Sequence, residues 1–351
     1  MLRADTGPQY LEDLATGYWF SEALFAAVEL EVFTLLEPKG MTTAELAAAL
    51  AMPASGLGRF LQALGALNLV MDEGGSYFNT QLASTYLVLG KPGYQGESIL
   101  WRKALTSGWQ DLSKCLKAGG RVDFPSEEEA PEQFALRIRK YINAMDNVAK
   151  TKVEEILPFF EGLDLREMLD VGTGSGAIAA GFLEQFPALS ATLLDIQEVL
   201  IYTQELLDKR EFGNRISYLP TNILEPWTAA KEGFDVIVLS NIIHVYSEEE
   251  LPLILKRAAT CLKPEGILVI HDFFPEHSSE KAALLDLNMF INTYNGRIFP
   301  QAWVREQLAM SKLYTTELIP LKTDTAVIFA TKDESKLSSL RLVNRTPQLA
   351  F

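Results

Sequence analysis

The sequence contains little cysteine and no long hydrophobic run, and both absences narrow the class of protein. Only 2 cysteines occur in 351 residues, and Cys115 and Cys261 lie too far apart along the chain to suggest a metal-ligand pair. We expect both to be free thiols of a reducing cytosol. No apolar run approaches the roughly 20 residues that span a bilayer, and the first residues lack the apolar core of a signal peptide. The sequence therefore predicts a cytoplasmic protein with no membrane partner.

Positive charge is scarce as well. The chain has 31 Lys and Arg against 46 Asp and Glu, which gives a formal net charge of −15 at pH 7. Residues 1–95 alone contain 4 basic and 10 acidic residues, a balance of 4 − 10 = −6. Binding to a phosphate backbone requires a basic surface, so we expect no nucleic-acid partner. A hydrophobic content of 48% is nevertheless that of a globular chain with a substantial core.

Helical patterns dominate the region before residue 96. Apolar residues recur at helical spacing from about 18 to 36 and again from about 53 to 69. Between these two segments, Thr42–Glu45 is a capping box that opens a short helix. Gly74-Gly75 separates two extended stretches, which is a hairpin signal. Three helices followed by a hairpin predict a winged helix.

A different pattern begins near residue 167. Short β-rich runs alternate there with helical patterns, which predicts βαβ units and a mostly parallel sheet. The expected strands are 167–171, 190–194, 216–219, 236–239, 267–271 and 326–331. We therefore predict an α/β protein with three parts: an all-helical winged-helix domain at 1–95, a helical connector at 96–157 and a Rossmann-like domain at 158–351.

Glycines cluster where the first of these strands passes into a helix. Gly172, Gly174 and Gly176 would let the backbone approach a ligand closely, and the helix N-terminus presents free N–H donors. The pattern is ambiguous by itself. With Ala177 it also satisfies the fingerprint for nicotinamide dinucleotides, and a purely structural tight turn is a third reading.

Three polar residues favour S-adenosylmethionine (SAM) as the ligand. Asp170 precedes the first glycine by two residues, where a carboxylate can meet the charged amino-acid part of SAM but would repel a pyrophosphate. Asp195 ends the next strand about 20 residues later, where an acidic residue accepts hydrogen bonds from the ribose hydroxyls of either cofactor. Asn222 follows the third strand beside aliphatic residues that suit an adenine, and it reads equally well as a turn residue.

With these residues, the chain resembles the SAM-dependent O-methyltransferases that carry an N-terminal winged-helix dimerisation domain. Plant phenolic, acetylserotonin and bacterial polyketide enzymes belong to this family. The resemblance covers about residues 10–330, and its markers are Asp170-x-Gly172-x-Gly174-x-Gly176, Asp195, Thr221-Asn222, Ser240-Asn241-Ile242-Ile243-His244 and the strand ending in Asp272. It implies an enzyme that transfers a methyl group from SAM to a hydroxyl of a small aromatic or polyketide-like molecule. The cofactor residues that it implies are Asp170, Gly172, Gly174, Gly176, Asp195, Ile196, Asn222, Ile223, Ser240 and Asn241.

The family's catalytic base falls on His244. This histidine follows the fourth strand, so it would lie at the carboxyl edge of the sheet, where ligands of α/β proteins bind. A phenol with a pKa of about 10 is a poor nucleophile at pH 7, and a histidine can remove its proton as the methyl group transfers. Outside such a motif, a lone histidine reads more readily as a capping or buried structural residue. We interpret His271 and His277 as ordinary loop-side residues.

The sequence departs from the family at two positions beside this base. Val245 stands where the family has aspartate, and Ile298 falls near the second of two carboxylates that flank the base. Asp272 matches the first carboxylate, and one carboxylate is enough to orient an imidazole. Proximity alone is an alternative driving force for transfer to an already acidic acceptor. The resemblance implies His244 and Asp272 as the catalytic pair.

The resemblance also implies an acceptor pocket and a homodimer. The residues expected to line the pocket are Met145, Asn288, Met289 and Asn292. Methionine suits flat apolar ligands and asparagine can bind ring substituents, although such side chains are common in ordinary cores. The N-terminal domain would bury a large dimer interface, with Tyr18-Trp19-Phe20 either reaching into the partner's pocket or packing within the dimer.

Three other functions fit parts of the sequence. A DNA-binding regulator fits the winged helix, but the acidic N-terminal region argues against it. A nicotinamide dehydrogenase fits the glycine loop alone. A SAM-binding relative that methylates carbon or nitrogen, or uses SAM structurally for hydroxylation or decarboxylation, fits the replacements at positions 245 and 298. We expect no metal, because no cluster of Asp, Asn and Glu gathers near the motifs to hold Mg²⁺.

Overall fold

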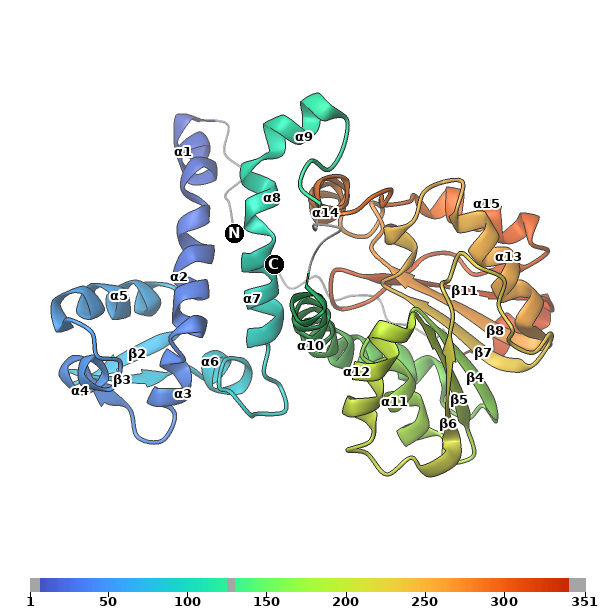
Figure 1. Ribbon diagram of the computed structural model, residues 1–351, viewed down its shortest axis with the longest axis horizontal. Helices are drawn as coiled ribbons and strands as arrows, with labels where there is room; N and C mark the ends of the chain where they lie inside the picture. Colours follow the sequence, from blue (N-terminus) through green and yellow to red (C-terminus); the bar gives the residue numbers. More distant parts are fainter. Residues whose placement is uncertain (1–6, 125–129, 341–351) are drawn as a thin grey trace. The chain divides into compact units, whose positions relative to one another are not determined.

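The computed structural model describes residues 7–124 and 130–340. The chain forms two compact units that divide between Ala104 and Leu105 (Figure 1). Of the expected connector at 96–157, the first helix falls in the N-terminal unit and the other helices fall in the second unit.

The N-terminal unit is helical apart from one small sheet. Its helices are α1 (Pro8–Thr16), α2 (Tyr18–Glu29), α3 (Val32–Leu36), α4 (Thr43–Ala49), α5 (Ala54–Ala66), α6 (Gln81–Tyr86) and α7 (Gly96–Ala104), and its strands are β1 (Met41–Thr42), β2 (Val70–Glu73) and β3 (Ser76–Asn79). The strands pair antiparallel in the order β1-β3-β2. The expected hairpin is confirmed as β2 and β3, and the description of this domain as all-helical omits its sheet.

Local sequence explains where two of these helices begin and end. Thr42 Oγ1 accepts from Glu45 N and the Glu45 carboxylate accepts from Thr42 N, so the predicted capping box of α4 is confirmed. The single helix predicted over 18–36 is wrong. Helix α2 ends at Glu29, and Glu31 adopts a φ of 52° before α3 begins. A left-handed residue cannot continue a right-handed helix, so the helical segment breaks there.

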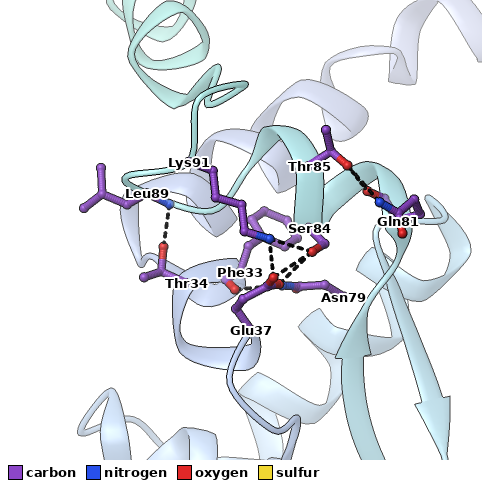
Figure 2. A network of polar contacts seen from close by, with 9 residues as sticks. All are labelled: Phe33, Thr34, Glu37, Asn79, Gln81, Ser84, Thr85, Leu89 and Lys91. Carbon is purple, nitrogen blue, oxygen red and sulfur yellow. Dashed lines mark hydrogen bonds and ion pairs between the residues drawn. The ribbon is translucent and has the colours of Figure 1, made fainter.

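A polar cluster around Glu37 ties α3 to β3 and α6 (Figure 2). The Glu37 carboxylate accepts hydrogen bonds from Asn79 Nδ2 at 2.9 Å and Ser84 Oγ at 2.8 Å, and it pairs with Lys91. Asn79 Nδ2 also donates to Phe33 O at 2.8 Å. These donors, with Lys91 contributing most, lower the pKa of Glu37 to about 2. The carboxylate therefore stays ionised while it links three elements.

The first two helices present large apolar side chains to solvent. Tyr18, Trp19 and Phe20 at the start of α2 are 62%, 60% and 57% exposed. Leu11 and Leu14 on α1 are also exposed. Exposed apolar groups gathered in this way are typical of interaction surfaces.

The second unit is a mixed sheet between layers of helices (Figure 1). Its strands are β4 (Glu167–Val171), β5 (Ser190–Asp195), β6 (Ile216–Pro220), β7 (Phe234–Ser240), β8 (Leu262–Asp272), β9 (Tyr314–Thr315), β10 (Ile319–Pro320) and β11 (Ala326–Thr331). Its α-helices are α8 (Thr106–Gln110), α9 (Leu112–Ala118), α10 (Pro131–Ile156), α11 (Ala177–Gln185), α12 (Gln197–Leu207), α13 (Leu251–Cys261), α14 (Ser279–Asn292) and α15 (Gln301–Met310). All the predicted strands are present, whereas β9 and β10 are too short for a sequence pattern to indicate.

The strand order of this sheet locates a crevice. The order is β10-β11-β8-β7-β4-β5-β6, with β9 paired to β11. Strands β4 to β8 run parallel to one another, and β8, β9 and β10 each pair antiparallel with β11. The predicted, mostly parallel sheet is confirmed. Because β4 pairs with β5 on one side and with β7 on the other, the chain reverses its direction across the sheet, and ligands of open α/β sheets bind at such a point.

Apolar side chains alternate between the two faces of the sheet and build two cores. On β4, Met168 packs with residues of α10, α11 and α12, whereas Leu169 packs on the opposite face with residues of α13 and α15. The two helical layers are visible on either side of the sheet in Figure 1. None of the helices in residues 7–124 and 130–340 has the length and apolar character needed to cross a membrane.

Candidate functional site

The glycine loop lies between β4 and α11. Gly172, Gly174 and Gly176 have φ angles of 67°, 55° and 76°, a region that L side chains rarely adopt. A Cβ at Gly172 would lie 2.7 Å from Ile242 Cδ1, so this glycine lets the loop pass close to the segment after β7. A Cβ at Gly174 would meet no described atom within 4 Å. The loop thus borders open space, which suits the close approach of a ligand.

Asp170 lies behind this loop. The residue is 2% exposed, and its Oδ2 accepts a hydrogen bond from Thr173 Oγ1 at 2.7 Å. Burial raises the pKa of Asp170 to about 6, against the opposing effect of hydrogen bonds from Thr173 and the Ala179 N–H. The side chain therefore fixes the loop from inside and supplies a carboxylate whose charged form a nearby cation would stabilise.

Asp195 at the end of β5 contacts the same loop. Its Oδ2 accepts from Gly174 N at 3.0 Å and its Oδ1 accepts from Ile196 N at 2.8 Å. Burial raises the pKa of Asp195, while these two hydrogen bonds lower it. Ile196 beside it is 37% exposed. Asp195 and the glycine loop therefore lie together at the carboxyl edge of the sheet.

The residues after β6 have structural contacts of their own. Asn222 Oδ1 accepts from Leu224 N at 3.0 Å, which is a side-chain-to-backbone turn. Ile223 is 6% exposed and belongs to the core on the α13 side of the sheet. Thr221 N donates to Asp195 O at 2.9 Å, so the turn adjoins the end of β5. An adenine contact of Asn222 or Ile223 stays a prediction.

The end of β7 carries a buried acceptor without a donor. Asn241 adopts a φ of 53°, and its Oδ1 is buried and accepts no hydrogen bond from the residues that the structure describes. Its backbone N–H donates to His271 O at 2.8 Å, and the preceding Ser240 Oγ lies 2.8 Å from His271 Nδ1. An unsatisfied buried acceptor is costly, so the Asn241 oxygen suits a ligand that donates a hydrogen bond.

His244 and Asp272 form a hydrogen-bonded pair beyond the ends of β7 and β8. The His244 Nδ1 to Asp272 Oδ1 distance is 2.6 Å, and 13% of the His244 side chain is exposed while Asp272 is fully buried. Asp272 Oδ2 accepts from the backbone N–H of Ile243 at 3.1 Å and of His244 at 3.4 Å. Because Asp272 engages Nδ1, Nε2 is the ring nitrogen left to exchange a proton with a ligand.

The position expected for a second carboxylate is apolar in the structure. Ile298 is 6% exposed, and its backbone N–H donates to Asp286 Oδ1 at 2.7 Å. A Cβ at Gly296 would lie 2.6 Å from His244 O, so the loop before Ile298 packs directly on the backbone of the histidine. The Phe273 ring meets the His244 ring edge-on, with centroids 6.0 Å apart. Backbone and aromatic contacts therefore confine His244 on this side.

The expected acceptor residues on α14 share one hydrogen-bond cluster. Asn288 Oδ1 accepts from Trp109 Nε1 and from Asn292 Nδ2, each at 3.0 Å. Asn288 and Met289 are each 8% exposed. Met145 lies on a different helix, α10, and is half-buried. The structure thus joins the two asparagines and adds Trp109, which no sequence pattern marks.

Two residues near the site, the buried His271 and the partly buried Tyr246, have features that are not evident from the sequence. The prediction that His271 is a loop-side residue is wrong, because it lies in β8 with no exposed surface. Tyr246 follows His244 by two residues, and burial raises the pKa of its hydroxyl, with the charges of Asp195 and Glu250 adding to the effect. Its closeness to the motif histidine is the one signal that marks Tyr246 in the sequence.

Two protein families match most of the chain. Residues 12–89 match the O-methyltransferase dimerisation domain, and residues 112–314 match the O-methyltransferase domain. The mitomycin biosynthesis 6-O-methyltransferase of Streptomyces lavendulae is 26% identical over 298 residues, which cover 80% of this chain and 82% of that protein. The 3-hydroxy-5-methyl-1-naphthoate 3-O-methyltransferase of Streptomyces sahachiroi is 26% identical over 308 residues, which cover 85% of this chain and 88% of that protein.

The fold is also that of a solved structure. Human N-acetylserotonin methyltransferase in complex with SAM matches with a TM-score of 0.82 at 24% identity, over 93% of this chain and 98% of that chain. At this identity the likeness shows a common fold.

Proposed function

The chain belongs to the SAM-dependent O-methyltransferases that carry an N-terminal dimerisation domain, and from this premise we propose that His244 is the general base for methylation of an aromatic hydroxyl. The observation that carries the proposal is the His244–Asp272 pair, with its Nδ1 to Oδ1 distance of 2.6 Å. His244 lies two residues after Ile242, the side chain that packs against Gly172 of the glycine loop.

SAM is the cofactor of this family, and the residues around the glycine loop fit it. Gly174 borders open space, the buried Asn241 Oδ1 lacks a donor among the described residues, and Asp170 and Asp195 add negative charge. These features suit a ligand with a positively charged, hydrogen-donating end. The proposed cofactor residues are Asp170, Gly172, Gly174, Gly176, Asp195, Ile196, Asn222, Ile223, Ser240 and Asn241. When bound, SAM supplies an electrophilic methyl group on a sulfonium.

In the proposed mechanism the protein moves one proton. Asp272 holds His244 by Nδ1, so Nε2 takes the proton of the acceptor hydroxyl as the new oxygen–carbon bond forms. The His244 ring then carries a positive charge, which the Asp272 carboxylate stabilises. Backbone N–H groups of Ile243 and His244 keep that carboxylate in place.

Side chains on α14 and α10 support a proposal for the acceptor class. We propose Met145, Asn288, Met289 and Asn292 as acceptor residues. Because Asn288 Oδ1 already accepts two hydrogen bonds, its amide N–H groups are left to donate to a ring substituent. The relative from Streptomyces sahachiroi acts on a hydroxylated naphthoate, which supports a small aromatic acceptor here.

The direct test uses methyl-labelled SAM and a panel of phenols, catechols and hydroxyquinones. We expect the wild type to label a product oxygen, and we expect His244→Ala to lower kcat by about 10² to 10⁴ with little change in SAM affinity. His277→Gln alters the histidine in the turn after β8 and is the matched control, with kcat unchanged. Undiminished turnover of His244→Ala would refute the base assignment. Label on nitrogen or carbon, or SAM binding without transfer, would instead favour the alternative that the replacements at 245 and 298 left open.

We also propose that the protein is a homodimer formed through residues 12–89. The exposed Tyr18, Trp19 and Phe20 lie within this range and supply apolar contact area. In sedimentation equilibrium the 39.0 kDa chain should have about twice that mass, and Trp19→Lys should shift it toward the monomer. A wild-type monomer at micromolar concentration would contradict the proposal.

A further inference from the structure

The last two residues of β8 hold the end of β7 and the segment that follows it. Asp272 holds the second half through Ile243 and His244. His271 holds the first half: its Nδ1 lies 2.8 Å from Ser240 Oγ, and its carbonyl accepts from Asn241 N at 2.8 Å. Ser240 is the register partner of His271 in the parallel pairing of β7 with β8. The His271 side chain therefore extends the strand pairing into the turn.

The second ring nitrogen of His271 is anchored from another strand. His271 Nε2 lies 2.8 Å from Thr325 Oγ1, and both residues are fully buried. Thr325 directly precedes β11, whose first residue, Ala326, pairs with Asp272. In a neutral imidazole one nitrogen donates and the other accepts, and a hydroxyl can take either role. With a hydroxyl at each nitrogen, the ring cannot rotate without losing both hydrogen bonds.

We propose that His271 is a positioning residue that holds Ser240 and Asn241 in the conformation that binds SAM. The inference rests on the proposed assignment of the segment after β7 to the cofactor site. Asn241 has a φ of 53°, a left-handed conformation that asparagine adopts more readily than other non-glycine residues and that a contact from its neighbours can select. The His271 carbonyl and imidazole supply such contacts to two consecutive residues. They hold Asn241 where its buried Oδ1 is left for the ligand.

Burial keeps the ring of His271 neutral. It is the largest effect and brings the pKa of His271 to about 3, while Asp272 and Asp324 raise the pKa and Lys152 and His244 lower it. The ring is therefore uncharged wherever the enzyme works. As a result, His244 is the one imidazole beside Asp272 that can become charged, because His271 stays neutral.

The test measures the affinity of the full-length protein for S-adenosylhomocysteine by calorimetry, because binding of the demethylated product needs no proton transfer. His271→Leu removes both ring hydrogen bonds and should weaken binding about tenfold. His271→Asn, whose amide reaches the place of Nδ1, should keep binding within about threefold of the wild type. Ser240→Ala should weaken binding about fivefold. Combined with His271→Leu, its loss should be less than additive, because the two side chains share one hydrogen bond.

Two threonine variants separate positioning from general stability. Thr325→Val keeps the volume of the side chain but removes the hydroxyl that anchors Nε2 of His271. It should weaken binding, and it tests the positioning role independently if His271→Leu does not fold. Thr316→Val removes a hydroxyl that accepts from Phe329 N in the same unit, away from the site. It should lower Tm and leave the affinity unchanged.

The outcomes distinguish this inference from the proposed function. Wild-type affinity in His271→Leu or Thr325→Val, or additive losses in the double variant, would overturn the positioning role. If these variants lose affinity while His244→Ala keeps full turnover, the base assignment fails and the positioning role stands.

Discussion

Glu37 in the N-terminal unit and His271 in the second unit are both titratable, but Glu37 is ionised and His271 is neutral. Glu37 accepts from Asn79 and Ser84 and pairs with Lys91, so its pKa falls to about 2 and it is ionised. His271 is fully buried and has a hydroxyl at each ring nitrogen. Burial lowers its pKa to about 3, so the ring is neutral. A lowered pKa therefore means a retained charge for one group and a suppressed charge for the other.

The difference follows from what each group has to stabilise it. The Glu37 side chain is 28% exposed and lies beside a cation, so water and Lys91 both favour its charge. His271 lies in the sheet, where desolvation outweighs the pull of Asp272. Glu37 joins elements of the N-terminal unit, whereas His271 and Asp272 hold the segment that carries His244. We therefore expect changes at Glu37 to affect stability and changes at Asp272 to affect turnover.

Neutralising one carboxylate in each unit tests this contrast most directly and has the largest expected effect. Asp272→Asn should lower kcat by about 10² or more, because an amide cannot stabilise the charged His244 ring. Glu37→Gln should leave kcat unchanged and lower the free energy of unfolding by about 1 to 2 kcal/mol, because it weakens charge-assisted hydrogen bonds in a partly exposed cluster. Initial rates with labelled SAM and urea unfolding curves measure the two effects. A loss of turnover in folded Glu37→Gln would erase the contrast.

The features that the sequence predicts well are those set by neighbours along the chain. The glycine loop, the capping box at Thr42 and the alternating strands depend on residues within one or two turns or strands. His244 is predicted because its motif immediately follows a β-rich run. Its pairing with Asp272 is expected from the family resemblance, and the structure shows the 2.6 Å contact.

The features that the sequence misses depend on distant partners or on single backbone angles. The sequence places His271 at the end of an expected strand but misses its burial, which comes from Thr325, 54 positions away, and from β11 beside it. The left-handed Glu31, which lies between α2 and α3, leaves no pattern in the apolar spacing. Trp109 meets Asn288 across 179 positions. Side-chain contacts of this range arise only from packing.

Acid unfolding gives a smaller effect that sharpens the comparison. The pKa of His271 is about 3 in the folded protein against an ordinary 6.5, so the unfolded chain binds the proton first. Stability from the neutral ring is complete above pH 6.5 and is lost as the pH falls toward 3. At pH 5 the loss is about 2 kcal/mol. The pKa of Glu37 is about 2 against 4.5, so its contribution to stability is nearly intact at pH 5 and is lost only between about pH 4.5 and pH 2.

Urea unfolding at pH 7 and pH 5 measures these contributions. Between the two pH values, His271→Asn should lose less unfolding free energy than the wild type, and Glu37→Gln should lose as much as the wild type. Parallel losses in the wild type and His271→Asn would mean that the folded protein accommodates the charged ring, and the contrast between the two units would then fail.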